Sequence, residues 1–440
     1  MLRTIDLRGR DLSTAELLAA VPRAQAARAQ ALSAAADIVA DVRERGEDAL
    51  REQAEHFDRV TGHDIRVPAA HLDEALERLD PTVRAALEET IRRVRAASAA
   101  QVPAPVVTEL GPGAVVEQRW QPVRRAGVYV PGGKAVYPSS VVMNVVPAQV
   151  AGVGEVAVAS PPQAEFDGRV HPDILAAAKL LGIDEVYALG GAGAVAAYAY
   201  GVASIGLEPV DVVTGPGNNF VAAAKRAVAG VVGTDAEAGA TEILIVADGG
   251  ADASLIAVDL ISQAEHDEQA SAVLVTWSED LARTVRAEVE RRVDATRNGA
   301  RARAALEGPQ SAVVLVDDRA AATAFSNAYA PEHLELHLVD PRPEDFVNAG
   351  AVFVGAWSPV SLGDYLAGSN HVLPTGGQAR YAAGLSASTF LRPQQVIAYD
   401  RAALEAVGAE IVALADAEAL PAHGEAVTAR FAANATGSED

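Results

Sequence analysis

Two side chains that are able to bind a metal ion lie three residues apart in the stretch from Ile261 to Gln269, which reads ISQAEHDEQ. The apolar pattern of residues 253–265 predicts a helix, and the spacing then places Gln263 and His266 on one face. An amide oxygen and a neutral imidazole nitrogen both bind divalent metals, but two ligands do not close a site. The pair therefore predicts either half of a metal site or the polar end of a buried helix.

A carboxylate and an imidazole adjoin each other at Glu332 and His333, directly after Pro331 and before an apparent strand. Such a pair is suited to proton transfer near neutral pH, the histidine by its ordinary pKa and the glutamate if burial raises its pKa. We therefore predict a catalytic pair, or alternatively a structural turn at a sheet edge. The alternation that follows predicts a surface position for His337.

Further candidates lie toward the C-terminus. The stretch from Gly355 to Gly377 is so rich in Gly, Ser, Pro and Asn that we predict a long ordered loop, neither helix nor strand. It makes Asp364 and His371 candidate metal ligands, with Asp364 as the anionic oxygen ligand that zinc favours. A final helical segment begins near Arg401, and by spacing alone its His423 is a surface residue.

Composition limits the classes of function. The chain of 440 residues has a formal net charge of −23, which argues against binding to nucleic acid or to an anionic membrane. With no cysteine there is neither a disulfide nor a thiolate ligand, so that any metal must be bound by His, Asp, Glu and amides. The N-terminus lacks the apolar core of a signal peptide, and no run of eighteen apolar residues occurs, so we expect a cytoplasmic protein.

The chain changes character near its first quarter. Residues 13–101 follow a helical pattern, with histidines predicted to lie in solvated connections: His56, His63 and His71. Residues 101–122 contain many Pro and Gly and predict irregular structure or short strands at a domain boundary. From Ala126 onward, short β-branched runs that end in glycine alternate with alanine-rich helical runs. This alternation predicts an α/β fold with a mainly parallel sheet that is covered on both faces.

Three glycine-containing turns lie where such sheets bind ligands, at the carboxyl ends of strands. Residues 191–196 read GAGAVA, a weak dinucleotide fingerprint because the acid about twenty residues on, Asp211, begins a strand and does not end one. Residues 215–218 read GPGN and predict either a phosphate site at a helix start or a tight turn with Asn218 as N-cap. Residues 130–140 read VPGGKAVYPSS, which fits a nucleotide clamp or a structural loop.

Five long motifs together resemble the histidinol dehydrogenase family, from about Ile38 to Ala433 and in order. They are VYVPGGKAVYPSSVVMNVVPAQVAGV, TGPGNNFVAAAKR, DLISQAEHDEQA, APEHLEL and SPVSLGDYLAGSNHVLPTGG. The resemblance implies the oxidation of L-histidinol, through an aldehyde, to L-histidine, with two NAD per turnover and one bound zinc per subunit. It also implies a homodimer whose active sites take residues from both chains.

Site residues follow from the resemblance by position. The implied zinc ligands are Gln263, His266, Asp364 and His423. The implied catalytic pair is Glu332 and His333. The implied substrate contacts are Thr241, Gln263, His266, His333, Asp364, Glu418 and His423, with the last two expected from the partner chain. The implied NAD contacts are Tyr129, Asn218 and position 193.

The chain departs from the family at two positions. Gly193 stands where the family commonly has a glutamine that touches NAD, so this contact is lost or replaced. Thr241 stands in place of a substrate-binding serine and keeps the hydroxyl. Two alternatives therefore stay open beside the histidinol reaction: a paralogue with the same zinc site that oxidises another small alcohol, and a zinc hydrolase in which Glu332 activates water.

The predicted fold has two Rossmann-like parallel-sheet domains with helical segments at both ends. We predict an N-terminal helical segment over residues 1–24 and a discontinuous first α/β domain over 25–128 and 241–382, which carries most zinc and catalytic residues. The second α/β domain, on the NAD side, is predicted over residues 129–240. Residues 383–440 are predicted as a C-terminal helical segment that contributes to the partner's active site.

Overall fold

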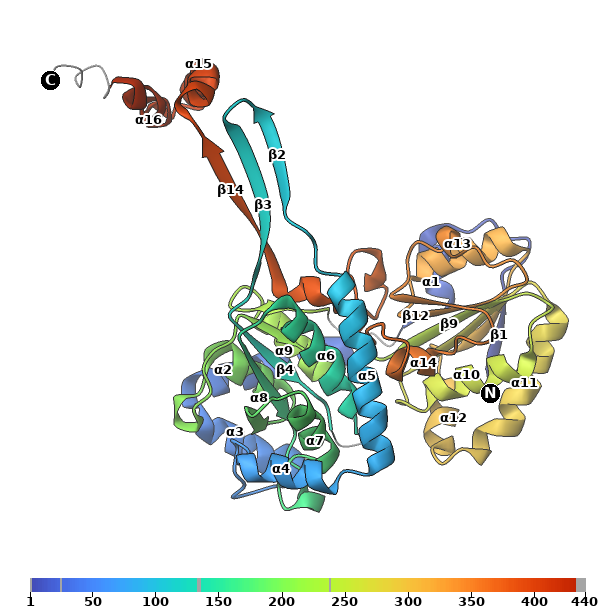
Figure 1. Ribbon diagram of the computed structural model, residues 1–440. Helices are drawn as coiled ribbons and strands as arrows, with labels where there is room; N and C mark the ends of the chain where they lie inside the picture. Colours follow the sequence, from blue (N-terminus) through green and yellow to red (C-terminus); the bar gives the residue numbers. More distant parts are fainter. Residues whose placement is uncertain (1, 24–25, 133–135, 237–238, 433–440) are drawn as a thin grey trace. The chain divides into compact units, whose positions relative to one another are not determined.

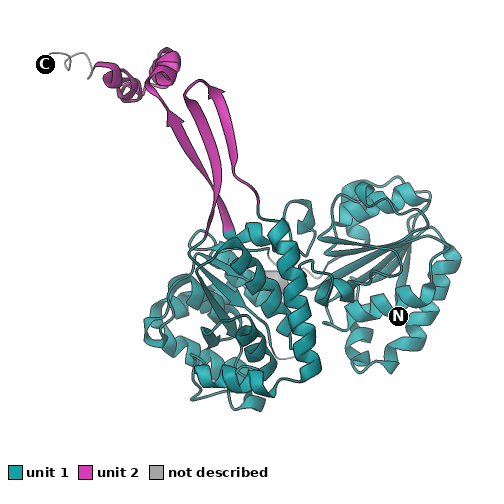
Figure 2. Ribbon diagram, viewed as in Figure 1, with its two compact units in different colours: residues 1–102, 123–390 teal, residues 103–122, 391–440 magenta. Residues whose placement is uncertain are grey.

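The computed structural model describes residues 2–23, 26–132, 136–236 and 239–432. The chain divides into two compact units (Figure 2): unit 1 consists of residues 1–102 and 123–390, and unit 2 of residues 103–122 and 391–440. Within the described ranges, no helix is both long enough and apolar enough to cross a membrane. Residues 133–135, part of the predicted clamp, lie outside the described residues.

Unit 1 contains a parallel sheet of six strands in the order β1-β11-β10-β9-β12-β13 (Figure 1). The strands are β1 (Arg3–Asp6), β9 (Glu242–Ala247), β10 (Ser271–Thr276), β11 (Ala312–Leu315), β12 (His333–His337) and β13 (Ala351–Val354). In β9, Ile243 and Ile245 pack toward α10 (Ala253–Ala264), α11 (Glu279–Arg292) and α12 (Gly299–Glu307). Leu244 and Val246 pack toward α1 (Thr14–Ala20) and α13 (Arg319–Tyr329). Because both faces are covered, β9 is apolar along most of its length.

Unit 1 contains a second parallel sheet, of five strands in the order β6-β5-β4-β7-β8. Its strands are β4 (Arg125–Tyr129), β5 (Glu155–Ser160), β6 (Val186–Ala188), β7 (Val212–Thr214) and β8 (Gly233–Thr234). Its helices are α6 (Pro138–Ala151), α7 (Pro172–Leu180), α8 (Gly191–Tyr200) and α9 (Asn219–Ala227). The chain moves outward from β4 to β6 and then in the opposite direction from β7 to β8. The carboxyl ends of β4 and β7 therefore flank a topological switch point, where ligands bind in such sheets.

The helical lead-in packs beside the five-stranded sheet. Its helices are α2 (Ala26–Arg45), α3 (Glu47–Gln53), α4 (Ala69–Arg78) and α5 (Pro81–Ala100), with a π-helical turn, η1 (Ala54–Asp58). Helix α2 contacts α8 and α9, α4 contacts α7, and α5 contacts α6. The predicted four-part division of the chain stays a prediction. The remaining short elements of unit 1 are α14 (Val360–Tyr365) and the 3₁₀ turns η2 (Ala164–Phe166), η3 (Ala203–Ile205), η4 (Val293–Ala295), η5 (Pro343–Asp345), η6 (Gln378–Arg380) and η7 (Ala387–Phe390).

Unit 2 is an antiparallel three-stranded ribbon followed by a helical hairpin. Its elements are β2 (Val106–Gly111), β3 (Ala114–Pro122), β14 (Leu391–Tyr399), α15 (Arg401–Ala417) and α16 (Pro421–Ala432). The central strand β3 pairs with both neighbours. The Asp400 side chain caps α15 and lies where a Cβ on Gly113 would come within 2.0 Å of it, so this turn requires glycine.

The α/β fold with two helix-covered parallel sheets is confirmed, but several local predictions were wrong. The C-terminal segment over residues 383–440 is not helical throughout, because β14 pairs with β3 before α15 begins. His56 and His71 lie in η1 and α4, not in connections. The N-terminal segment contains a strand, β1, in addition to α1. His337 is buried, because β12 has a neighbour on each side and helices on both faces. His63 is also buried, since residues 65–67 run along the edge strand β6. Residues 360–365 form a helix within the predicted loop.

Candidate functional site

Glu332 and His333 lie at the amino end of β12, with 6% and 4% of their surfaces exposed. Glu332 Oε2 accepts a hydrogen bond from Thr241 Oγ1 at 2.6 Å and another from the backbone N–H of Glu242 at 2.8 Å. Gln263 Nε2 in turn donates to Thr241 Oγ1. His333 Nδ1 lies 3.0 Å from the carbonyl oxygen of Glu242. Because a carbonyl can only accept, Nδ1 carries a proton, and in the neutral ring Nε2 keeps a free lone pair.

The Glu332 carboxyl is tuned by burial. Burial raises its pKa to about 7, while His333 and the Thr241 hydroxyl oppose this increase and only partly offset it. A carboxyl whose pKa lies near neutral pH is able both to take and to return a proton during a reaction. The predicted Glu332–His333 pair is thus brought together in the form that proton transfer needs.

A cavity of about 470 Å³ lies in unit 1 in front of this pair. Besides Thr241, Glu332 and His333, it is lined by five more of the predicted residues: Tyr129, Asn218, His266, Asp364 and His371. Gln263 is buried behind Thr241, with 2% of its surface exposed. The volume lies within the range of small-molecule sites, and the lining combines titratable groups with glycine turns.

His266 and Asp364 bring an imidazole and a carboxylate to the wall of the cavity, two groups of the kind that could bind a metal. Burial lowers the pKa of His266, and the nearby Asp364 carboxylate opposes this shift. The neutral imidazole is the form that binds a metal. His371, predicted as another ligand, has both ring nitrogens engaged: Nδ1 lies 2.9 Å from the Asp364 carbonyl oxygen, and Nε2 lies 3.1 Å from Ser140 Oγ. These contacts connect His371 to the Asp364 segment and to α6, and its role as a ligand stays a prediction.

The residues predicted to contact NAD lie at the switch point of the five-stranded sheet. Tyr129, the last residue of β4, is buried, and its hydroxyl accepts a hydrogen bond from the Gly191 backbone N–H at 3.1 Å. Asn218 is the N-cap of α9, because its Oδ1 accepts the backbone N–H of Phe220 at 3.0 Å. The N-cap alternative is thereby confirmed. A Cβ on Gly215 would lie 1.9 Å from the Tyr129 carbonyl oxygen, so only glycine lets β4 and the turn approach this closely.

Position 193 faces a side chain from another helix. A Cβ on Gly193 would lie 2.2 Å from Gln53 Oε1, so the Gln53 amide occupies the space beside this glycine. Gln53 Nε2 is buried and has no hydrogen-bond partner among the described residues. Asp211 precedes β7, and its carboxylate accepts the backbone N–H of Arg124 at 2.7 Å. The weak dinucleotide fingerprint around 191–196 is thus not completed by Asp211.

Glu418 and His423 lie in unit 2, where Glu418 ends α15 and His423 belongs to α16. Both are exposed. The structure brings the other predicted residues together in unit 1, and the contribution of these two to an active site stays a prediction.

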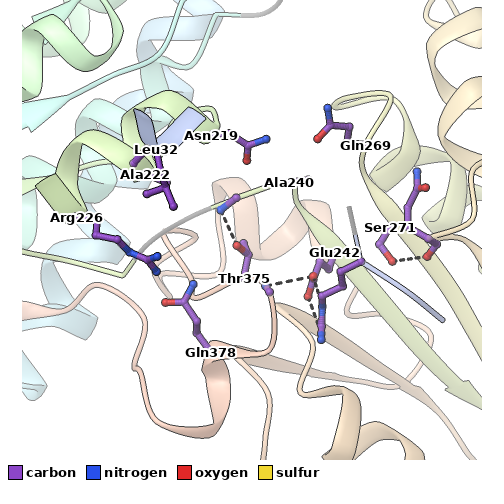
Figure 3. A pocket seen from close by; sticks show the side chains of 15 residues that line it. Leu32, Asn219, Ala222, Arg226, Ala240, Glu242, Gln269, Ser271, Thr375 and Gln378 are labelled. Atoms are coloured by element: carbon purple, nitrogen blue, oxygen red, sulfur yellow. Dashed lines mark hydrogen bonds and ion pairs between the residues drawn. The ribbon is translucent and has the colours of Figure 1, made fainter. Parts of the chain in front are cut away.

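The sequence analysis did not identify the residues that form hydrogen bonds with the Glu242 side chain at the start of β9. Arg23 Nε donates to Glu242 Oε1 at 2.6 Å, and the Gly376 backbone N–H donates to the same oxygen at 3.2 Å. These contacts lie at a second cavity, of about 80 Å³, whose lining includes Glu242, Thr375 and Gln378 (Figure 3). Since partners such as Arg23 and Glu242 are more than 200 residues apart, no local pattern could have indicated them.

The chain matches the sequence model of the family described as histidinol dehydrogenase over residues 21–431. It is 63% identical to a histidinol dehydrogenase of Leifsonia xyli subsp. xyli, over 98% of this chain and 99% of that protein. It is 57% identical to one of Mycobacterium tuberculosis, over 98% of each chain. The crystal structure of histidinol dehydrogenase from Elizabethkingia anophelis superposes with a TM-score of 0.90 at 31% identity, covering 99% of each chain. The chain therefore belongs to the histidinol dehydrogenase family, whose members are oxidoreductases of histidine biosynthesis.

Proposed function

We propose that the protein oxidises L-histidinol, through L-histidinal, to L-histidine, with zinc bound at the site and NAD as the electron acceptor. The observation that carries this proposal is the cavity of unit 1, which joins the Glu332–His333 pair to His266 and Asp364 in a member of this family. The His266 imidazole, whose pKa burial lowers, and the nearby Asp364 carboxylate are side chains of the kind that bind zinc.

The donor set fits zinc. His266 supplies a neutral imidazole, Asp364 a carboxylate and Gln263 an amide oxygen that is not engaged by Thr241. We assign His423 as the fourth ligand, from the partner chain. When bound, zinc supplies Lewis-acid polarisation and a fixed position for the imidazole and the amino group of the substrate.

The two members of the catalytic pair perform different tasks. With Nδ1–H held by the Glu242 carbonyl oxygen, His333 presents Nε2 to the cavity, where it takes the hydroxyl proton as hydride leaves to NAD. Glu332 has one oxygen held by Thr241 and Glu242 and the other available to a water molecule. The Glu332 carboxylate takes a proton from the water that adds to the aldehyde, and a second hydride transfer then gives the carboxylic acid.

We propose that NAD binds at the switch point of the five-stranded sheet. Tyr129 and Asn218 line the cavity there, and the buried, unpartnered Nε2 of Gln53 is a donor that a polar group of the cofactor satisfies. In this chain Gln53 thus stands in for the side chain that Gly193 lacks.

Replacing Gly193 by Gln is expected to weaken NAD binding about tenfold, the equivalent of one hydrogen bond. The new Cβ would lie 2.2 Å from Gln53 Oε1 and displace that amide. Gln53→Ala alone should cause a similar loss, whereas the double variant Gln53→Ala/Gly193→Gln should bind NAD more tightly than either single variant. Calorimetric titration with NAD measures the effect, and thermal unfolding without NAD controls for stability. Simple addition of the two losses would contradict the exchange of roles.

The proposed function is tested by counting NADH. Zinc-loaded protein is mixed with L-histidinol and excess NAD, and the NADH absorbance is compared with the histidinol consumed. Two NADH per histidinol, with L-histidine as product, is the expected result. If zinc is bound and no NADH forms, L-histidinol is not the substrate.

A further inference from the structure

Three polar side chains meet between α10 and β12, outside the cavity described above. Asp259 lies on α10, and Glu335 and His337 are alternate residues of β12, so both point to the same face of the sheet. A ligand atom of each lies within 4.8 Å of the other two, and Glu335 Oε2 lies 3.2 Å from His337 Nε2. The neighbouring β9 places Ile245 and Ala247 at the same levels. A polar group on β12 therefore lies beside the apolar side chains that β9 contributes to the same face.

The group is buried and lacks a cationic side chain. Glu335 is 1% and His337 9% exposed, and Asp259 is half-buried. Among the described residues, neither carboxylate forms an ion pair with a lysine or an arginine. Burial and the neighbouring Glu335 carboxylate raise the pKa of Asp259 to about 7, so near neutral pH this carboxyl holds a proton that a bound cation would replace. Buried carboxylates of this kind are paired, protonated or bound to a metal.

The geometry matches a metal ion of ordinary size. Ligand atoms at about 2.1 Å from one ion are roughly 3.0 to 3.4 Å apart, which includes the Glu335–His337 distance of 3.2 Å. The second oxygen of Glu335 accepts the Val360 backbone N–H at 2.9 Å, and this bond fixes the orientation of the carboxylate. Asp259 is the least buried of the three and supplies the third ligand atom of the group.

We propose that Asp259, Glu335 and His337 bind one divalent transition-metal ion of the class of Zn²⁺ or Mn²⁺, with water at the remaining positions. Two carboxylates neutralise the ion, and the imidazole favours this class over Mg²⁺ and Ca²⁺. The site shares no residue with the zinc ligands of the proposed function. Asp259 lies one helical turn, about 6 Å, before Gln263 on α10. An ion here ties α10 to β12, the two elements that carry Gln263 and His333.

The test counts metal ions in the untagged, full-length protein. The protein is stripped with a chelator and titrated with Zn²⁺, the bound metal is measured by mass spectrometry, and Co²⁺ absorbance reports the ligand set. Wild type should bind two ions per chain. His337→Gln and Asp259→Asn should each retain one and bind the other about 100-fold more weakly or worse. The exposed His56 gives the matched control His56→Gln, which should retain both.

A His266→Gln variant separates this proposal from the proposed function. It should retain the ion at Asp259, Glu335 and His337 and lose the other one. The second site would be overturned if the wild type binds one ion, if His266→Gln loses it, and if His337→Gln and Asp259→Asn keep it. The proposed function would then stay intact. One ion with the opposite dependence would support the second site and overturn the zinc ligands assigned above. Circular dichroism confirms that each variant is folded, and Asp259→Asn, at the half-buried position, keeps the test decisive if His337→Gln does not fold.

Discussion

Replacement of Glu332 by Gln is expected to slow the oxidation of L-histidinal by roughly 10²- to 10⁴-fold, while the oxidation of L-histidinol to the aldehyde is slowed far less. Gln keeps the size of the side chain and an oxygen that accepts the Thr241 and Glu242 hydrogen bonds, but it cannot take a proton from water. The alcohol step depends instead on His333. Supplying the alcohol and the aldehyde separately and following NADH measures the two rates, and an equal loss in both would contradict the separation of roles.

The same carboxyl predicts how the aldehyde step depends on pH. Burial disfavours the charged form and raises the pKa of Glu332 from 4.5 to about 7, so the carboxylate base is lost as pH falls through about 7. The rate of histidinal oxidation should then fall about tenfold per pH unit below that value and level off above it. Glu332→Gln should remove this limb. Thr241→Val, which removes a hydrogen bond that lowers this pKa, should move the limb to higher pH, whereas Thr241→Ser should leave it in place.

The parts of the site that adjacent residues encode could be predicted from the sequence. Glu332 and His333 are adjacent in the chain and lie at the start of one strand. Their proximity could therefore be predicted from the local sequence. Gln263 and His266 likewise follow from one helix end. Contacts between distant segments could not be predicted in this way: the Arg23–Glu242 pair and the Gln53 amide beside Gly193 depend on how whole helices pack.

Two wrong predictions have a common physical cause, since tertiary packing overrides local pattern. The alternation after His333 is typical of a strand with one wet face, but β12 lies between β9 and β13 under helices, and His337 is buried with Glu335 as partner. Residues 360–365 form a helix that contains Gly363, and packing against β13 requires glycine there, because a Cβ would lie 2.6 Å from the Phe353 ring. In both places, contacts with segments that are distant in the sequence determine the local structure, and the residues on either side of each position do not indicate those contacts.

Co-expression of a His333→Ala chain with a His423→Ala chain is expected to restore activity that neither variant has alone. If His423 reaches the site of the partner chain, a mixed dimer contains one site that lacks both histidines and one that lacks neither. Random pairing makes half of the dimers mixed, so that about a quarter of the wild-type activity should return. The exposed position of His423 on α16, in a unit separate from His333, motivates this assignment.

Two controls make the complementation decisive. A His333→Ala chain paired with a His266→Ala chain should restore no oxidation, because both residues belong to unit 1 and every site then lacks either the base for the alcohol step or a zinc ligand. Distinct affinity tags allow the mixed dimer to be isolated and its zinc counted, with one intact ligand set per dimer expected. If the His333→Ala and His423→Ala mixture stays inactive although mixed dimers form, each chain must supply its own His423, and α16 would then have to complete the site of the chain that carries it.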